Sequence, residues 1–86
     1  MRINPMVVCR EEANGSGCLF NPDDGKVFGM NATGMLIWKS LADGDDTETI
    51  LGKLRAIGAP GNTVADDLAE FLAALREHGM IEDAAE

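Results

Sequence analysis

The stretch that decides the fold is KVFGMNATGMLIW, residues 26–38, in which a short apolar strand passes directly into an apolar helix. Side chains alternate along a strand, so Phe28 and Met30 lie on one face, and Val27 and Gly29 lie on the other. Asn31 follows at once, and its side-chain oxygen suits the cap of a helix. The stretch therefore predicts a strand that is followed within one residue by a helix.

Two further strands are predicted upstream of this stretch. Residues 6–13 begin apolar and end charged, as a strand does when it leaves a core, and residues 18–20 resume the apolar pattern. The intervening residues 14–17 and 21–25 are rich in Asn, Gly, Asp and Pro, which favour turns. Together with residues 26–30, these segments predict a three-stranded antiparallel meander.

The first predicted helix covers residues 32–41 and ends at the Asp-Gly pair of residues 43–44. An interior glycine lowers helix propensity, so Gly34 predicts the close approach of another backbone. The buried stripe of this helix is formed by Met35, Leu36, Ile37, Trp38 and Leu41.

Two more helices complete the pattern. The second covers residues 48–57, is capped by Asp46 or Thr47, and turns inward Ile50, Leu51, Leu54 and Ile57. Thr63, with Asp66 three residues later, predicts a variant of the capping box at the start of the third helix. The buried stripe of the third helix is formed by Val64, Leu68, Phe71, Leu72 and Leu75.

The 86 residues suffice for one domain. We expect this domain to cover residues 1–81, with Met80 and Ile81 folding back onto the core after Gly79. Residues 82–86 are expected to form an acidic, solvated tail. Three strands followed by three helices predict an α+β fold class, with a winged-helix-like arrangement of a three-stranded antiparallel sheet and three helices.

The net charge is −8, from 15 acidic and 7 basic residues, which disfavours nucleic acid and anionic membranes as partners. A winged-helix protein that binds nucleic acid would present Asp66, Asp67 and Glu70 of the third helix to phosphates, where basic residues are needed. No signal peptide or long apolar run is visible, so a cytoplasmic location is expected.

Residues for catalysis or metal binding are few. His78 is the only histidine, and its position near a helix end favours a capping role through the helix dipole. Together with Cys9 and Cys18 it is too small a set for a closed zinc site, which needs about four ligands. No nucleophile–base pair or phosphate loop is evident. We therefore expect no enzyme activity, no cofactor and no metal.

The chain resembles the PqqD family, the small proteins of pyrroloquinoline quinone biosynthesis and their relatives, the RiPP recognition elements of peptide-modifying pathways. The likeness spans about residues 5–81. Its first half is carried by Met30-Asn31, Ala32-Thr33-Gly34, Leu36-Ile37-Trp38, Asp43-Gly44 and the threonine-led helix of residues 47–54. Its closing motif is carried by Asp67-Leu68, Phe71-Leu72, Leu75 and Gly79. Met30 departs from the pattern, because leucine is usual there.

The resemblance implies a peptide chaperone that binds the leader of a ribosomally made precursor peptide and presents it to a modifying enzyme, often a radical-SAM protein. In the family the leader adds as a strand beside the third strand and packs against the third helix, a mode known as β-augmentation. The peptide-binding residues implied here are Val27, Phe28, Gly29, Met30, Asp67, Phe71 and Ala74. Asp67, Phe71 and Ala74 share one helix flank, and either this flank or the opposite one faces the strand.

Two alternative hypotheses remain open at this stage. One is a protein-interaction module of the same fold that is unrelated to peptide modification. The other is a winged-helix protein that binds nucleic acid, which the acidic third helix disfavours. An exposed strand edge also permits a homodimer or strand exchange.

Overall fold

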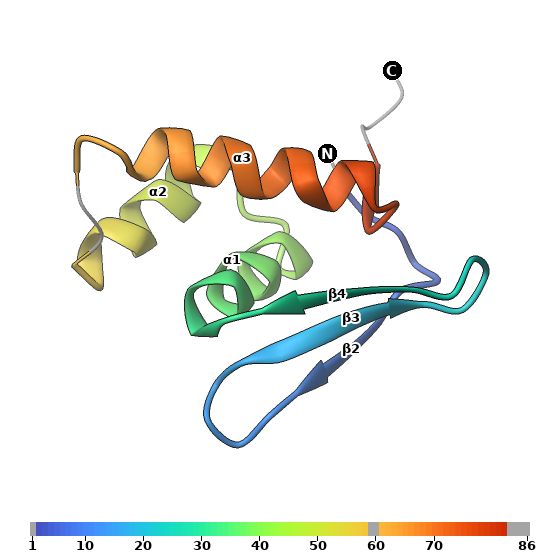
Figure 1. The fold of residues 1–86 in the computed structure, drawn as a ribbon. Coiled ribbons are helices and arrows are strands. Elements are labelled where there is room, and N and C mark those ends of the chain that lie inside the picture. Colours follow the sequence, from blue (N-terminus) through green and yellow to red (C-terminus); the bar gives the residue numbers. More distant parts are fainter. Residues whose placement is uncertain (1, 59–60, 83–86) are drawn as a thin grey trace.

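The structure is a computed structural model that describes residues 2–58 and 61–82 (Figure 1). In chain order its elements are β1 (Arg2–Ile3), β2 (Val8–Glu11), β3 (Gly17–Asn21), β4 (Lys26–Met30), α1 (Ala32–Ala42), α2 (Thr47–Ala56), α3 (Val64–Glu77) and β5 (Ile81–Glu82). The antiparallel sheet of β2, β3 and β4, followed by three helices, confirms the predicted α+β fold class. No helix within the described ranges is long and apolar enough to cross a membrane.

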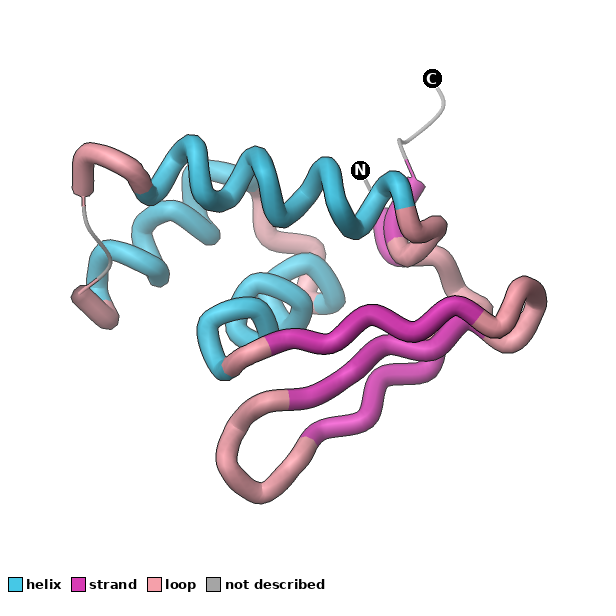
Figure 2. The backbone as a smooth tube through the Cα atoms, viewed as in Figure 1, coloured by secondary structure: helices cyan, strands magenta, loops and turns pink. Residues whose placement is uncertain are grey.

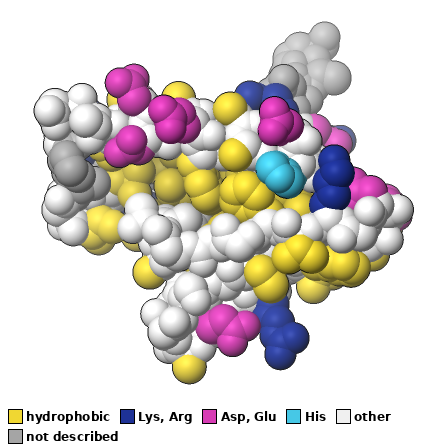
Figure 3. All heavy atoms as spheres, viewed as in Figure 1, with side chains coloured by type: hydrophobic (Ala, Val, Ile, Leu, Met, Phe, Trp, Pro, Cys, Tyr) yellow, Lys and Arg dark blue, Asp and Glu magenta, His cyan; other side chains and the backbone are white. Residues whose placement is uncertain are grey.

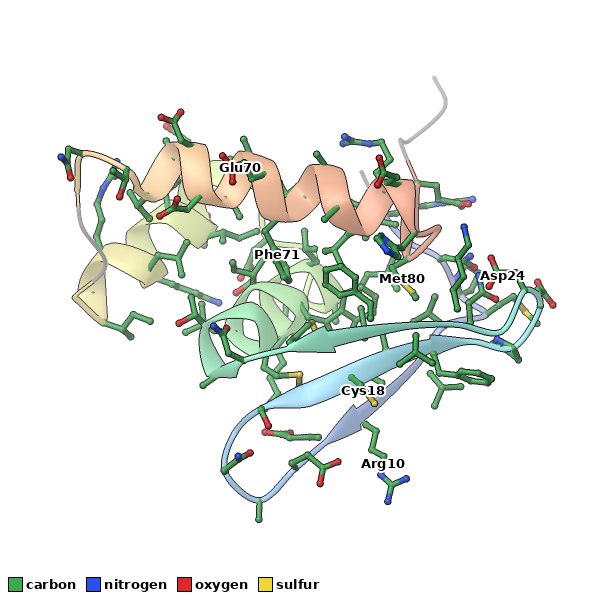
Figure 4. The ribbon with its side chains drawn as sticks, viewed as in Figure 1. Arg10, Cys18, Asp24, Glu70, Phe71 and Met80 are labelled. Carbon is green, nitrogen blue, oxygen red and sulfur yellow. The ribbon has the colours of Figure 1, made fainter. Side chains whose placement is uncertain are left out.

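The register of the sheet separates a core face from an outer face. Leu19 on β3 lies opposite Phe28 on β4, and this row faces the helices, where Leu19 is completely buried. The next row places Phe20 opposite Val27 and Val8, and these side chains are exposed on the outer face. Arg10 and Cys18 also point away from the helices (Figure 4). The sheet thus buries one face only, as antiparallel sheets often do.

The first hairpin differs from the prediction because its turn starts earlier. The predicted strand of residues 6–13 is wrong in length, since β2 covers only Val8–Glu11. The amide of Glu12 donates to the carbonyl of Ser16 at 2.7 Å, and the Asn14 side chain accepts the Ser16 amide at 3.0 Å. These turn hydrogen bonds hold residues 12–16 in a loop that is longer than the predicted four residues.

The helices cover the core face of the sheet. Figures 1 and 2 show α1 between the sheet and α3, while α3 runs above the β4 edge of the sheet. At the start of α1, Asn31 accepts the amide of Gly34 at 2.9 Å, which confirms the predicted cap. The buried core draws on the sheet, the three helices and the C-terminal strand, and it includes Leu19, Trp38, Ile50, Leu68, Leu75 and Met80.

Two predicted details of α2 and α3 are wrong. Ile57 was expected inward, but α2 ends at Ala56, and the Ile57 side chain beyond it is exposed. Thr63 precedes α3 without a side-chain cap hydrogen bond, so the predicted capping box is absent. Asp46 does cap α2, since its carboxylate accepts the amide of Thr49 at 2.8 Å.

A second, two-stranded sheet joins the two ends of the described chain. Ile3 in β1 pairs with Ile81 in β5, and the side-chain amide of Asn4 donates to the carbonyl of Gly79 at 2.9 Å. Ile81 is buried, as predicted. Glu82 belongs to β5 and not to a free tail; the rest of the predicted tail lies outside the described residues. We name this pairing of β1 and β5, together with the Asn4 contact, the clasp.

Candidate functional site

The free edge of β4 is the strongest candidate for a binding surface. Within residues 2–58 and 61–82, β4 pairs only with β3, so its other side carries unpaired backbone groups that can accept another strand. β2 is the opposite edge of the same sheet, and its side chains are all exposed. Within the described residues, α3 runs along the β4 edge and not along the β2 edge (Figure 2).

Aromatic rings line the space between β4 and α3. The Phe28 ring packs edge to face against two other rings, Phe71 in α3 and His78 at its C-terminal end. The centroid distances are 5.8 Å to Phe71 and 5.2 Å to His78. Phe71 projects from α3 towards β4 (Figure 4), and all three side chains are half-buried. His78 is the C-cap of α3, with Nδ1 at 2.8 Å from the carbonyl oxygen of Ala74. We call the space between the β4 edge and α3, with this aromatic floor, the groove.

A pocket opens at the end of the groove near the start of α3. Its volume is about 210 Å³, and its lining is mostly apolar; the lining residues are Asn31, Thr33, Gly34, Ile37, Leu54, Val64, Asp67, Leu68 and Phe71. Small-molecule sites usually measure about 300–1,000 Å³. The size therefore suits a single large side chain better than a free ligand. Figure 3 shows the yellow hollow below α3.

Gly34 explains how the pocket wall is assembled. A Cβ atom at this position would lie 3.1 Å from the Cβ of Met30 and 3.2 Å from the ring of Phe71. The predicted close neighbour was another backbone, which is wrong: the neighbours are side chains. The absence of a side chain at Gly34 lets the Phe71 ring lie against the start of α1.

The structure distributes the sequence-predicted residues over three environments. On α3, the flank of Asp67, Phe71 and Ala74 faces β4, because Phe71 contacts Phe28. On β4, Met30 is buried in the core, with 6% of its surface exposed, so only its backbone is available at the edge. Val27 and Gly29 are exposed, with the Val27 side chain on the outer face of the sheet.

Sequence reasoning missed the part played by His78 in the groove. Positions 67, 71, 74 and 78 are spaced by four, three and four residues, which places them on one helix face. That spacing was available from the sequence. The pocket residues Asn31 and Thr33 carried no comparable signal, since they read as a cap and a first helical turn.

Other parts of the described chain are weaker candidates for a binding site. Among residues 2–58 and 61–82, no group of three or more His, Cys, Asp or Glu side chains is placed to hold a metal ion. A second hollow of about 400 Å³ lies between α1 and the first hairpin. Two of its charged residues pair with each other, Lys39 Nζ lying 2.9 Å from Glu11. The groove is thus the more apolar of the two.

The geometry defines a small winged-helix-like α+β domain in which a free strand edge faces an aromatic helix flank. The chain belongs to the PqqD family: the family model described as "Coenzyme PQQ synthesis protein D (PqqD)" matches residues 17–81. This confirms the resemblance found in the sequence.

A solved structure gives the same result over the whole chain. The structure titled "TbiB1 in Complex with the TbiA(beta) Leader Peptide" is 31% identical, with a TM-score of 0.88, and the match covers 100% of both chains. A comparison with curated proteins found no match.

Proposed function

We propose that this protein binds the leader segment of a ribosomally synthesised precursor peptide as an added strand along β4, and presents it to a modifying enzyme. The observation that carries the proposal is the free β4 edge beside the aromatic flank of α3. Backbone hydrogen bonds supply affinity in this binding mode, and side-chain pockets supply specificity. The similarity to a chain whose solved structure is titled as a complex with a leader peptide supports a leader peptide as the ligand.

Each predicted residue takes a role in this proposal. Val27, Gly29 and Met30 act through their backbone, whereas the side chain of Phe28 forms the floor. Asp67, Phe71 and Ala74 form the opposite bank, with Asp67 and Phe71 also lining the pocket. The protein itself performs no chemistry on the peptide and acts in the cytoplasm.

The first test is an NMR titration of labelled protein with the leader of the precursor peptide that is encoded nearest to its gene. We expect shift changes at residues 26–31 and along residues 67–78, together with slower hydrogen exchange at β4 amides. β2 is the internal control, because it is the other free edge of the sheet and lies away from α3 (Figure 1). Changes confined to β2 would contradict strand addition at β4. With no changes anywhere, the interaction module without a role in peptide modification would take precedence.

The second test compares two phenylalanines. Phe71→Ala removes part of the groove, and we expect leader affinity to fall about tenfold or more, as for an interface hot spot. Phe20→Ala is the matched control, because Phe20 lies on the outer face of the sheet and is 41% exposed. Equal losses of affinity for the two variants would place the leader elsewhere.

The proposed enzyme partner belongs to the radical-SAM class, and the pathway is that of pyrroloquinoline quinone or another modified peptide. The description of the matching family model supports the pyrroloquinoline quinone pathway, and the radical-SAM partner is what the family resemblance implies. The test is turnover of the full-length precursor by the radical-SAM enzyme that is encoded nearest to the gene, with and without this protein. We expect faster modification of the precursor with its leader and no effect on a precursor without it. Stimulation of a different class of modifying enzyme would correct the partner and leave leader binding intact.

A further inference from the structure

The α3 side of the groove is acidic at one end and basic at the other. The face formed by positions 67, 71, 74 and 78 begins with the exposed carboxylate of Asp67. It continues through the half-buried Phe71 and Ala74 and ends with the imidazole of His78. The helix therefore offers an anion at one end of the groove and a basic ring at the other.

The β4 side of the groove also becomes more basic from the pocket end to the His78 end. Lys26, Phe28 and Met30 alternate onto the same face of the strand. Met30 and Phe71 both approach Gly34, which places them at the pocket end, and Phe28 touches both Phe71 and His78. Lys26 precedes Phe28 and so belongs to the His78 end. Figure 3 shows acidic side chains over the start of α3 and a basic side chain beside the histidine.

The two charged side chains that mark the ends are available. Within residues 2–58 and 61–82, neither the Asp67 carboxylate nor the Lys26 ammonium makes an ion pair or a side-chain hydrogen bond. Asp24 lies near Lys26, and its carboxylate accepts the Lys26 backbone amide at 3.0 Å. A ligand carboxylate at this end would therefore compete with Asp24 for the ammonium.

The dipole of α3 opposes this polarity but does not cancel it at the pocket end. A helix N-terminus carries roughly half a positive charge. The first two turns of α3 contain three carboxylates, from Asp66, Asp67 and Glu70, so the local charge there stays negative. The acidic end of the groove is thus a property of this sequence and not of the fold.

β4 and α3 run in opposite directions along the groove. The end of β4, at Met30, lies with the pocket and the start of α3, whereas the start of β4, at Lys26, lies with the C-cap His78. A strand that adds antiparallel to β4 would therefore begin at Asp67 and finish at Lys26. Antiparallel pairing is also slightly the more stable of the two modes.

Resting on the proposed function, we propose that the groove reads the charge order of the leader. The bound strand carries a lysine or arginine towards its N-terminal end, beside Asp67, and an aspartate or glutamate towards its C-terminal end, beside Lys26 and His78. An apolar side chain next to the cation enters the pocket. Charge order thereby fixes the direction in which the leader lies along β4.

The test uses two synthetic peptides of identical composition, both acetylated and amidated so that their ends are uncharged. Each has the same alternating apolar residues; one has lysines in its N-terminal half and glutamates in its C-terminal half, and the other has the reverse order. We expect the first to bind about tenfold more tightly at low salt, with the difference shrinking as salt screens exposed charges. Fluorescence anisotropy of labelled peptides measures both affinities.

A charge exchange in the protein makes the test specific to the groove. The double variant Asp67→Lys with Lys26→Glu should invert the preference between the peptides. The matched control is Glu12→Lys with Arg10→Glu, which makes the same changes of charge at exposed positions of the first hairpin, outside the pocket and away from α3. We expect the control to keep the original preference, and circular dichroism verifies that both double variants are folded.

The outcomes separate the two proposals. If both peptides bind along β4 with equal affinity, the proposal that charge order fixes the leader's direction is overturned. The same holds if the double variant keeps the original preference. In both cases the proposal that the protein binds a leader stands. A preference for the reverse order also overturns the inferred direction. If neither peptide nor the genomic leader binds, both proposals fail.

Discussion

At the scale of single residues, the groove depends on one missing side chain. Gly34 sits where Met30 of β4 and Phe71 of α3 converge on the start of α1, and it is buried. Glycine is a poor helix former, so its presence in α1 lowers helix stability by roughly 1 kcal/mol relative to alanine. The gain is that Phe71 can pack closely against α1 and form the pocket wall.

A substitution at this position should separate stability from binding. In Gly34→Ala the new Cβ pushes the half-buried Phe71 ring towards the groove, so the gain in helix propensity is largely offset by strain. We expect the free energy of unfolding to change by less than about 1 kcal/mol and leader affinity to fall several-fold. Urea unfolding and a binding titration measure the two effects.

The matched control is Gly52→Ala in α2, where a Cβ atom meets nothing within 4 Å. It should stabilise the protein by up to about 1 kcal/mol, because only helix propensity changes. Its affinity for the leader should be unaltered. If Gly34→Ala also left affinity intact, the contact between Gly34 and Phe71 would not matter for the groove.

Sequence reasoning succeeded for residues whose role is local. Asn31 was predicted as a cap, and Asp46 as one of two candidates beside Thr47, because a short polar side chain before an apolar helical pattern commonly caps the helix. Gly34 was recognised as a close approach, but its partner was not, since Phe71 is far away in the sequence. The same limit applies to His78, whose contact with Phe28 depends on how α3 crosses the sheet.

At the scale of elements, α2 is the least buried helix and depends on its cap. Ile50 and Leu54 are its only fully buried side chains, and Ile57 was predicted inward because it continued their spacing. The helix ends one residue before Ile57, so the apolar spacing in the sequence continues beyond the end of the helix. Asp46 holds the other end through its hydrogen bond with Thr49.

The Asp46 cap predicts a dependence of stability on pH. Hydrogen bonds from Thr49, first from its side chain and then from its backbone amide, lower the pKa of Asp46 in the folded state. A lowered folded pKa adds stability above the unfolded pKa, and this stability is lost as the pH falls through the folded pKa. We expect Asp46→Ala to lower Tm at neutral pH. We expect the difference in Tm between the variant and the wild type to disappear at acidic pH.

Thermal melts of both proteins from neutral to acidic pH measure this gap. Asp66→Ala is the control, because it removes an exposed carboxylate from the first turn of α3, where no side-chain cap hydrogen bond exists. A gap that stayed constant with pH would rule out the charged cap as its source.

At the scale of the whole molecule, the clasp was the element that the sequence did not predict. β1 and β5 have two residues each, too few for any alternation to be visible, and they pair across almost the entire chain. The prediction that Met80 and Ile81 return to the core was nevertheless confirmed, because two apolar residues after a helix-ending glycine have few other places to go.

Two contacts in the clasp should differ in energetic weight. The pair of Arg2 and Glu82, at 2.9 Å, is exposed, so Arg2→Ala should change stability by less than about 0.5 kcal/mol. Asn4 is half-buried and donates to the carbonyl of Gly79, so Asn4→Ala should cost about 1 kcal/mol. Urea unfolding of the two variants compares them, and a larger loss for Arg2→Ala would contradict this ranking.

The clasp also has a consequence for assembly. β5 begins three residues after His78, so residues 2–3 and 81–82 meet beside the end of the groove where an antiparallel leader would finish. The segment that follows a leader, which is the substrate for modification, would emerge there. An enzyme joined by a short linker to either side of the clasp would be tethered next to its substrate at a high effective concentration. An enzyme fused covalently at either side of the clasp would thus be held beside the segment of the peptide that it modifies.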